Sequence, residues 1–133
     1  MGIYLDDAKT LYAEAFHELE RWEQTQDATI LRDAAEKAWG AVTQAANELL
    51  DSYGHKVPSG TGIRRSGLHA LERQDRRLRS LRVEARFSDA ENVLHKECFY
   101  DGTCPLPLVT DMVAQDVKEF LEDVEQATQR GER

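Results

Sequence analysis

The sequence lacks most of the features that mark a familiar site or a membrane segment. It has only two cysteines, three prolines and 8% aromatic residues in 133 positions. No stretch approaches the roughly 18 consecutive apolar residues of a membrane span, which excludes an integral membrane protein. The N-terminus shows neither a basic leader nor an apolar signal core, so we expect a cytoplasmic protein. The phosphate-loop, dinucleotide-binding, nucleophile-elbow and zinc-protease motifs are absent, and mainstream enzyme classes find no support.

What the chain does contain is helical periodicity. Apolar residues recur at three- and four-residue steps over 3–24 and again over 28–53, where Asp27 is placed to cap the second helix and Gly54 to end it. A last helix is expected to begin between Pro105 and Thr110. With 41% apolar and 32% charged residues, the chain is predicted to form one all-α domain over 1–133, an up-down bundle of four to five helices.

The second helix is predicted to lie at the centre, because its apolar stripe is mostly alanine and small side chains let helices approach closely. Gly40 in mid-helix is explained by such a contact with a neighbouring helix or with Trp39. Over 65–99 the apolar stripe changes phase. One long helix with a shifted buried face would account for this, but we favour a short helix that meets a longer one near Arg79 and Ser80.

Charge is distributed unevenly along the chain. The net charge is −8, which argues against sequence-blind binding of nucleic acid, yet 64–86 holds eight arginines, three carboxylates and no lysine. Two interpretations stay open: the arginines pair with the acidic first and last helices, within a subunit or across a dimer, or they form a surface for phosphate or another anion. The candidates for the anion- or nucleotide-binding surface are Arg76, Arg79, Arg82 and Arg86.

The two cysteines flank a turn and lie close to a histidine. His95, Cys98 and Cys104 offer imidazole and sulfur, the ligands that zinc prefers, but a structural site needs a fourth. Two reduced thiols, a disulfide and a metal site are therefore alternatives, and the expected cytoplasmic setting favours the thiols. We predict no metal and no cofactor, with these three residues as the only weak metal candidates.

The phrase ILRDAAEKAWGAVTQAANELLDSYGHK at 30–56 resembles the central helix of HEPN domains (higher eukaryotes and prokaryotes nucleotide-binding) and of the related archaeal PaREP proteins. The preceding helix, the segment RFSDAENVLHKECFYDG and the closing VTDMVAQDVKEFLEDVE fit the same layout. The resemblance implies a helical bundle that commonly forms homodimers, and a family in which many members are ribonucleases with an arginine followed a few residues later by a histidine.

This chain departs from that catalytic pattern. At 91–95 it reads Glu-Asn-Val-Leu-His, so the asparagine and His95 are present but a glutamate stands in place of the arginine. His69 with Arg64 or Arg65 is a second candidate pair, although it falls in or just after the central loop. RNA cleavage needs a proton acceptor for the 2′-hydroxyl and a cation for the phosphorane, and Glu91 cannot supply the second.

The sequence therefore favours a HEPN/PaREP-like binding or accessory protein that is dimeric and non-catalytic or degenerate. A link to toxin–antitoxin or defence systems is expected, with a partner of the antitoxin or nucleotidyltransferase type, or with RNA or a nucleotide as ligand. The alternatives are a metal-independent ribonuclease that uses His95 or His69, and an anion-binding module built on the arginine block.

Overall fold

The computed structural model describes residues 2–131, and all of the regular structure in that range is helical. The chain begins with an antiparallel pair, α1 (Ile3–Thr25) and α2 (Ala28–Ser52), joined at Gln26 and Asp27. Gln26 turns the chain with a φ of 57°, and the Asp27 carboxylate accepts a hydrogen bond from the Thr29 backbone N–H at 2.9 Å. Both helices end within one residue of the predicted limits, and the predicted cap at Asp27 is confirmed.

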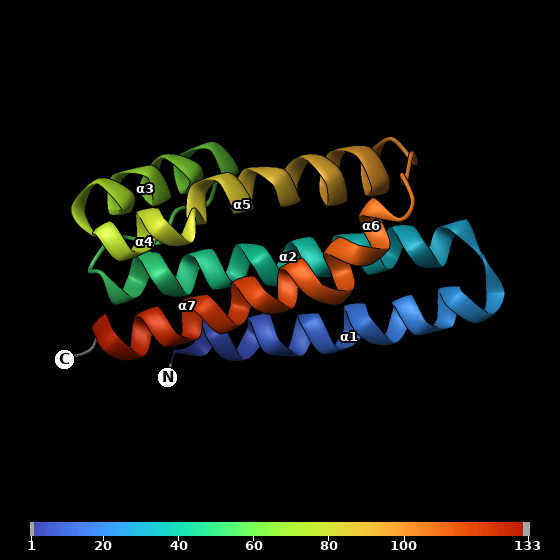
Figure 1. The fold of residues 1–133 in the computed structure, drawn as a ribbon, viewed down its shortest axis with the longest axis horizontal. Helices are drawn as coiled ribbons and strands as arrows, with labels where there is room; N and C mark the ends of the chain where they lie inside the picture. The colour runs from blue at the N-terminus through green and yellow to red at the C-terminus, as the bar shows by residue number, and fades with distance from the viewer. Residues whose placement is uncertain (1, 132–133) are drawn as a thin grey trace.

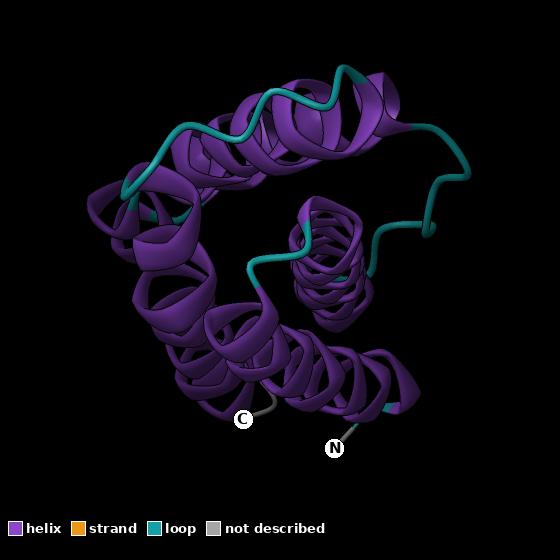
Figure 2. Cartoon of the chain, turned by 90° about the vertical axis from the view of Figure 1, so that its right-hand side faces the viewer, coloured by secondary structure: helices purple, strands orange, loops and turns teal. Residues whose placement is uncertain are grey.

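Helix α2 lies at the centre of the bundle. Figure 2, which looks along the bundle, shows the other helices around it, and it contacts α1, α3, α5, the segment Glu91–Tyr100 and α7. Gly40 allows the approach of α1, since a Cβ there would lie 3.3 Å from a Leu11 methyl carbon. Six alanines of α2 are fully buried: Ala34, Ala35, Ala38, Ala41, Ala45 and Ala46. The alanine stripe is thus covered within one chain, which confirms that the second helix lies at the centre of the bundle.

Three helices follow the central loop, and the chain bends sharply between them. Gly54 ends α2 with a φ of 81°, as predicted, and α3 (Thr61–Gln74) leads into the six-residue α4 (Arg76–Leu81) and then α5 (Val83–Ala90). The chain breaks at Asp75, whose backbone is extended, and at Arg82, which has a φ of 55°. The predicted single junction near Arg79 and Ser80 is wrong, because Asp75 caps α4 from one side and Arg82 turns the chain on the other.

Helix α5 continues without interruption into a π-helical segment, η1 (Glu91–Tyr100), which carries His95. A loop then leads to one further continuous helix made of α6 (Leu108–Asp111), the π-helical η2 (Met112–Asp116) and α7 (Val117–Gly131). This helix begins inside the predicted window and runs back beside α1 and α2 (Figure 1). Five long helices and the short α4 thus make up the described part of the chain, which confirms the all-α bundle.

The surface of the bundle carries one run of exposed apolar side chains. Tyr100 is 75% exposed, Leu106 55% and Leu108 47%, all around the loop that precedes α6. Within residues 2–131, none of the helices combines the length and the apolar character needed to cross a membrane.

Candidate functional site

The predicted catalytic histidine His95 forms a dyad with a residue of α2. Its Nδ1 lies 2.8 Å from Oε1 of Glu36, and the two side chains are 35% and 33% exposed. A carboxylate that accepts the Nδ1 proton fixes the imidazole tautomer and leaves Nε2 free to accept a proton. In chemical terms the dyad can act as a general base at the protein surface.

Aromatic side chains hold this imidazole in place. The His95 ring stacks on Trp39 of α2, with centroids 5.8 Å apart, and on Phe99 one turn further along η1, at 6.3 Å. Trp39 in turn packs against the buried Phe87 at 5.0 Å. The stack links the dyad to the core, so His95 has a structural role beside any chemical one.

The end of η1 is tied down covalently and by an arginine. Cys98 and Cys104 form a disulfide across the turn, and Arg32 of α2 donates from Nε and an Nη to the Phe99 carbonyl at 3.1 and 2.6 Å. The favoured interpretation of two reduced thiols is therefore wrong. The disulfide also removes both cysteine sulfurs from the weak metal candidates His95, Cys98 and Cys104. Residues 2–131 contain no group of three or more His, Cys, Asp or Glu side chains able to hold a metal ion.

Glu91 occupies the position where the family resemblance calls for a catalytic arginine. Its side chain is mostly buried, and its two oxygens lie 3.4 Å from an Nη of Arg65 and 3.7 Å from Nζ of Lys96. The candidate Arg65 is thereby neutralised by a carboxylate on the helix that carries His95.

His69 belongs to a different place on the molecule. Its Nδ1 lies 2.8 Å from Oε1 of Glu84, and its side chain is 57% exposed. The partner of Arg65 is Glu91, so the predicted Arg65–His69 pair is not linked by any hydrogen bond or ion pair of the described residues. His69 and His95 use separate carboxylates from separate helices.

The arginines of 64–86 divide into two groups. Arg64 is buried, where its Nε donates to Oδ1 of Asn47 at 2.7 Å and an Nη to the Pro58 carbonyl at 2.8 Å. Arg77 pairs with Asp75 at 3.1 Å. Four others are exposed and form no ion pair with any residue that the structure describes: Arg73, Arg76, Arg79 and Arg82. We call these four the arginine surface; they lie on α3, on α4 and at the turn into α5.

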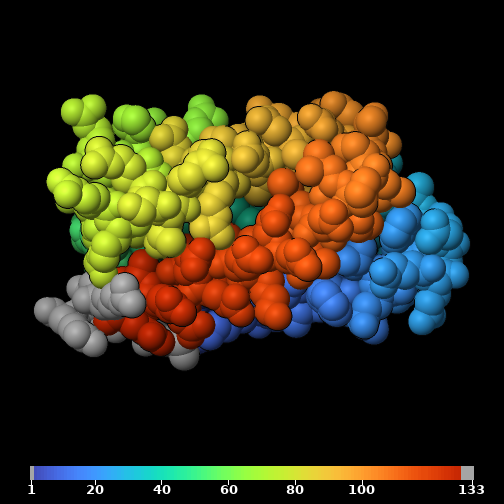
Figure 3. All heavy atoms as spheres, in the orientation of Figure 1, coloured from blue at the N-terminus to red at the C-terminus, as the bar shows by residue number. Residues whose placement is uncertain are grey.

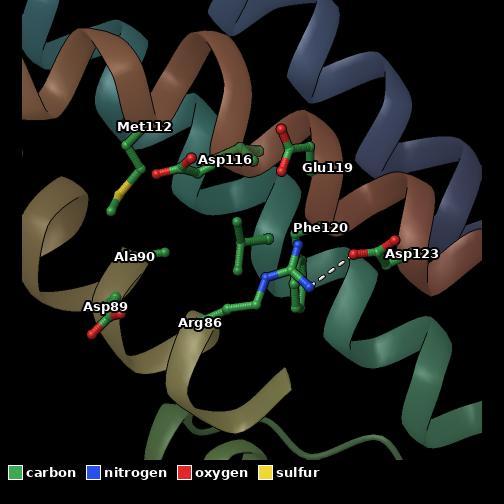
Figure 4. Close-up of a pocket in the computed structure, with 10 residues that line it drawn as sticks. Arg86, Asp89, Ala90, Met112, Asp116, Glu119, Phe120 and Asp123 are labelled. Atoms are coloured by element: carbon green, nitrogen blue, oxygen red, sulfur yellow. Dashed lines mark hydrogen bonds and ion pairs between the residues drawn. The ribbon is translucent and has the colours of Figure 1, made fainter. Parts of the chain in front are cut away.

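Arg86 does not belong to that surface. It reaches from α5 toward α7, where an Nη donates to Asp123 at 2.9 Å and its guanidinium carbon lies 5.2 Å from the Phe120 ring centroid (Figure 4). Its neighbours line a cavity of ≈ 320 Å³ between the two helices. In Figure 3 this cavity is the hollow between the yellow α5 and the orange α7, with α2 visible at its floor. The charges around Arg86 are carboxylates, which removes it from the predicted anion-binding set.

The pKa values of Asp75, Tyr53 and Arg64 depart clearly from their ordinary values. Hydrogen bonds from Arg77, together with one from the Tyr53 hydroxyl at 2.6 Å, lower the pKa of Asp75 from 3.8 to about 2. Burial and the hydrogen bond to Asp75 raise the pKa of Tyr53. Burial lowers the pKa of the Arg64 guanidinium. Asp75, Tyr53 and Arg77 hold the start of α4 together, whereas Arg64 links Asn47 of α2 to the central loop at Pro58.

Sequence reasoning found His95 but not its partner. Glu36 lies 59 positions earlier in the chain, and no local spacing connects the two. A usable signal was present in α2, where Glu36 and Trp39 are three residues apart and therefore share a helix face. The cavity beside Arg86 was missed for the same reason, because its walls come from three separate parts of the chain.

Comparison with known proteins adds no relative to this description: no family model, no curated protein and no solved structure matches the chain.

Proposed function

We propose that this chain is a non-catalytic, HEPN/PaREP-like binding protein that holds a phosphate-bearing ligand, a nucleotide or a short single-stranded RNA, on its arginine surface. The observation that carries the proposal is the set of four exposed arginines, Arg73, Arg76, Arg79 and Arg82, which have no carboxylate partner among the described residues. An arginine left without an internal partner retains its full capacity for bidentate contacts with phosphate. A solubilising face would not require arginine at every one of these positions.

The region around His95 supports binding rather than cleavage. Glu91 pairs with the candidate cation Arg65, and Arg32 donates from Nε and one Nη to the Phe99 carbonyl. Cleavage of RNA depends on stabilising negative charge as it develops, and removal of such a donor costs about a hundredfold to a thousandfold in rate. The dyad alone therefore supplies only half of what a metal-independent ribonuclease needs.

The test is titration of a fluorescent single-stranded oligoribonucleotide and of ATP at several salt concentrations. Replacing Arg76, Arg79 and Arg82 together by glutamine should weaken RNA binding and reduce the slope of log affinity against log salt by about 2, at about 0.7 per phosphate contact. A matched control replaces Arg21, Lys37 and Lys118, which lie outside the arginine surface, and removes the same charge. Equal losses in both triple variants would refute the proposal, because they would show an effect of net charge alone.

The proposal includes a homodimer. It rests on the exposed apolar run of Tyr100, Leu106 and Leu108, because apolar side chains gathered in one place on a surface mark a site of association. Light scattering coupled to gel filtration should give twice the monomer mass. The double change Tyr100→Ser and Leu106→Ser should return the monomer, whereas the matched change Ile3→Ser and Ile63→Ser at scattered exposed positions should not.

One observation favours a second candidate, the metal-independent ribonuclease: the carboxylate of Glu36 orients His95 as a general base requires. This alternative predicts RNA cleavage that survives EDTA and is lost in both Glu36→Gln and His95→Ala. His69→Ala would leave that activity intact, since its partner is Glu84. Cleavage that no single change reduces would come from a contaminant.

A further inference from the structure

The cavity between α5 and α7 combines an apolar floor with a strongly acidic rim. Its floor and walls are Val42 of α2, Ala90 of α5, and Met112, Val117 and Phe120 of the last helix, all of them buried. Its volume of ≈ 320 Å³ falls at the lower end of the range for small-molecule sites, about 300–1,000 Å³. Figure 4 shows Ala90 on one side of the groove and Met112 and Phe120 on the other.

The charge of the rim is unbalanced. Four carboxylates line the opening, Asp89, Asp116, Glu119 and Asp123, against the single guanidinium of Arg86. Arg86 is committed to Asp123 and to the Phe120 ring. The remaining three carboxylates are exposed and have no ion-pair or hydrogen-bond partner in residues 2–131. The opening therefore attracts positive charge, while the floor favours an apolar body.

These two properties together select the class of occupant. An anion would be repelled by the rim, and a neutral apolar molecule would gain nothing from the three carboxylates. A metal ion lacks a ligand set, since no cluster of three or more His, Cys, Asp or Glu side chains in the described residues could hold one. We propose that this cavity is a binding site for a small amphipathic organic cation, an amine that places an aromatic or branched alkyl body on Phe120, Met112 and Val117 and its ammonium group among Asp89, Asp116 and Glu119.

The residues present suit both halves of such a ligand. An ammonium group forms charge-assisted hydrogen bonds with carboxylates, which are about twice as strong as neutral ones. Met112 supplies an adaptable, polarisable wall against an aromatic ring. Arg86, which also lines the cavity, is held over the Phe120 ring and paired with Asp123, so it does not compete for the other three carboxylates. This site shares no residue with the arginine surface and would take a ligand of opposite charge. Its test is therefore independent of the test of the proposed function.

The first experiment compares an amine that carries both halves of the expected ligand with three probes that lack one of them. The probes are 2-phenylethylamine, 3-phenylpropanoate, 2-phenylethanol and spermidine, each titrated at millimolar concentration into the ¹⁵N-labelled protein. We expect saturable shifts of the Ala90 and Val117 amide resonances with 2-phenylethylamine, and affinities about tenfold weaker or worse for the other three. Equal affinity for the carboxylate or the alcohol would overturn the proposal, as would equal affinity for spermidine or the absence of saturable shifts with the amine.

The second experiment removes the rim charge. The triple variant Asp89→Asn, Asp116→Asn and Glu119→Gln should bind 2-phenylethylamine about tenfold more weakly than the wild type or worse. All three side chains are exposed, so the fold should be unchanged, which far-UV circular dichroism checks. The control Asp51→Asn, Asp111→Asn and Glu122→Gln removes three exposed carboxylates that do not line the cavity. An affinity that is equal in the two triple variants would overturn the proposal.

Discussion

Substitution of Asp75 by asparagine should lower stability in a manner that depends on pH. The Asp75 carboxylate accepts hydrogen bonds from the Tyr53 hydroxyl at 2.6 Å, from the Arg77 backbone N–H at 2.9 Å and from the Arg77 guanidinium at 3.1 Å. These partners lower its pKa from 3.8 to about 2. Its side chain is only 17% exposed, so solvent screens these interactions incompletely.

The magnitude follows from linkage. A carboxyl whose pKa is lower in the folded state stabilises the fold above its unfolded pKa, and this contribution is lost as the pH falls through the folded value. A difference of nearly two pKa units corresponds to about 2 kcal/mol of unfolding free energy near pH 6, and to only a few tenths of a kcal/mol at pH 2. Asparagine keeps the capping oxygen but not the charge. The Asp75→Asn variant should therefore be about 2 kcal/mol less stable than wild type near pH 6 and nearly equal to it at pH 2.

Urea denaturation followed by tryptophan fluorescence, repeated between these two pH values, measures the difference. Tyr53→Phe serves as a companion, since it removes one hydrogen bond and should cost about 1 kcal/mol at pH 6. A difference between wild type and Asp75→Asn that is constant over the whole pH range would refute the reasoning. A difference that grows toward acid pH would do so as well, because the sign would be reversed.

Three further predictions concern the core and the covalent link. Replacing Cys98 and Cys104 by alanine should lower the free energy of unfolding by about 2 kcal/mol, because the disulfide closes a short loop, and mass spectrometry of the wild type should show the oxidised mass. Leu49→Ala should cost about 2–5 kcal/mol in the same denaturation assay, since Leu49 is fully buried. Arg64→Ala should cost about 3 kcal/mol, because it leaves Asn47 without its hydrogen-bond donor; a loss below about 1 kcal/mol would mean that water replaces the guanidinium.

The parts of the fold that sequence predicted are those decided by local chemistry. Asp27 and Gly54 set the ends of α2 because a capping carboxylate and a left-handed glycine act on their own neighbours. The turn at Arg82 could not be predicted in this way. A positive φ is uncommon for a residue other than glycine, and no residue type at this position of the sequence indicates a turn. Tertiary packing of α3 against α5 stabilises that bend.

The candidate site was predictable only in part, for the same physical reason. His95 stood out through the family pattern at 91–95 and its closeness to the two cysteines, but Glu36 and Phe120 approach their partners from distant segments. The disulfide was one of three alternatives that the spacing of the cysteines allowed. The expected cytoplasmic setting tipped the choice toward thiols, and that setting is at odds with the bond found between Cys98 and Cys104.

The alanine-lined centre of the bundle has a consequence for how this protein tolerates change. In most cores the damaging substitutions are those that shorten large side chains. The six fully buried alanines of α2 have only a methyl group to lose, so the damaging change there is enlargement. Any larger residue there would push α1, α5 or α7 outward, and even serine would bring a hydroxyl into a dry contact. A saturation library selected for folding alone should therefore leave α2 as the least variable stretch of the chain, with permitted changes confined to its unburied positions such as Asp33 and Lys37. By contrast, the exposed Arg73, Arg76 and Arg79 should accept almost any residue.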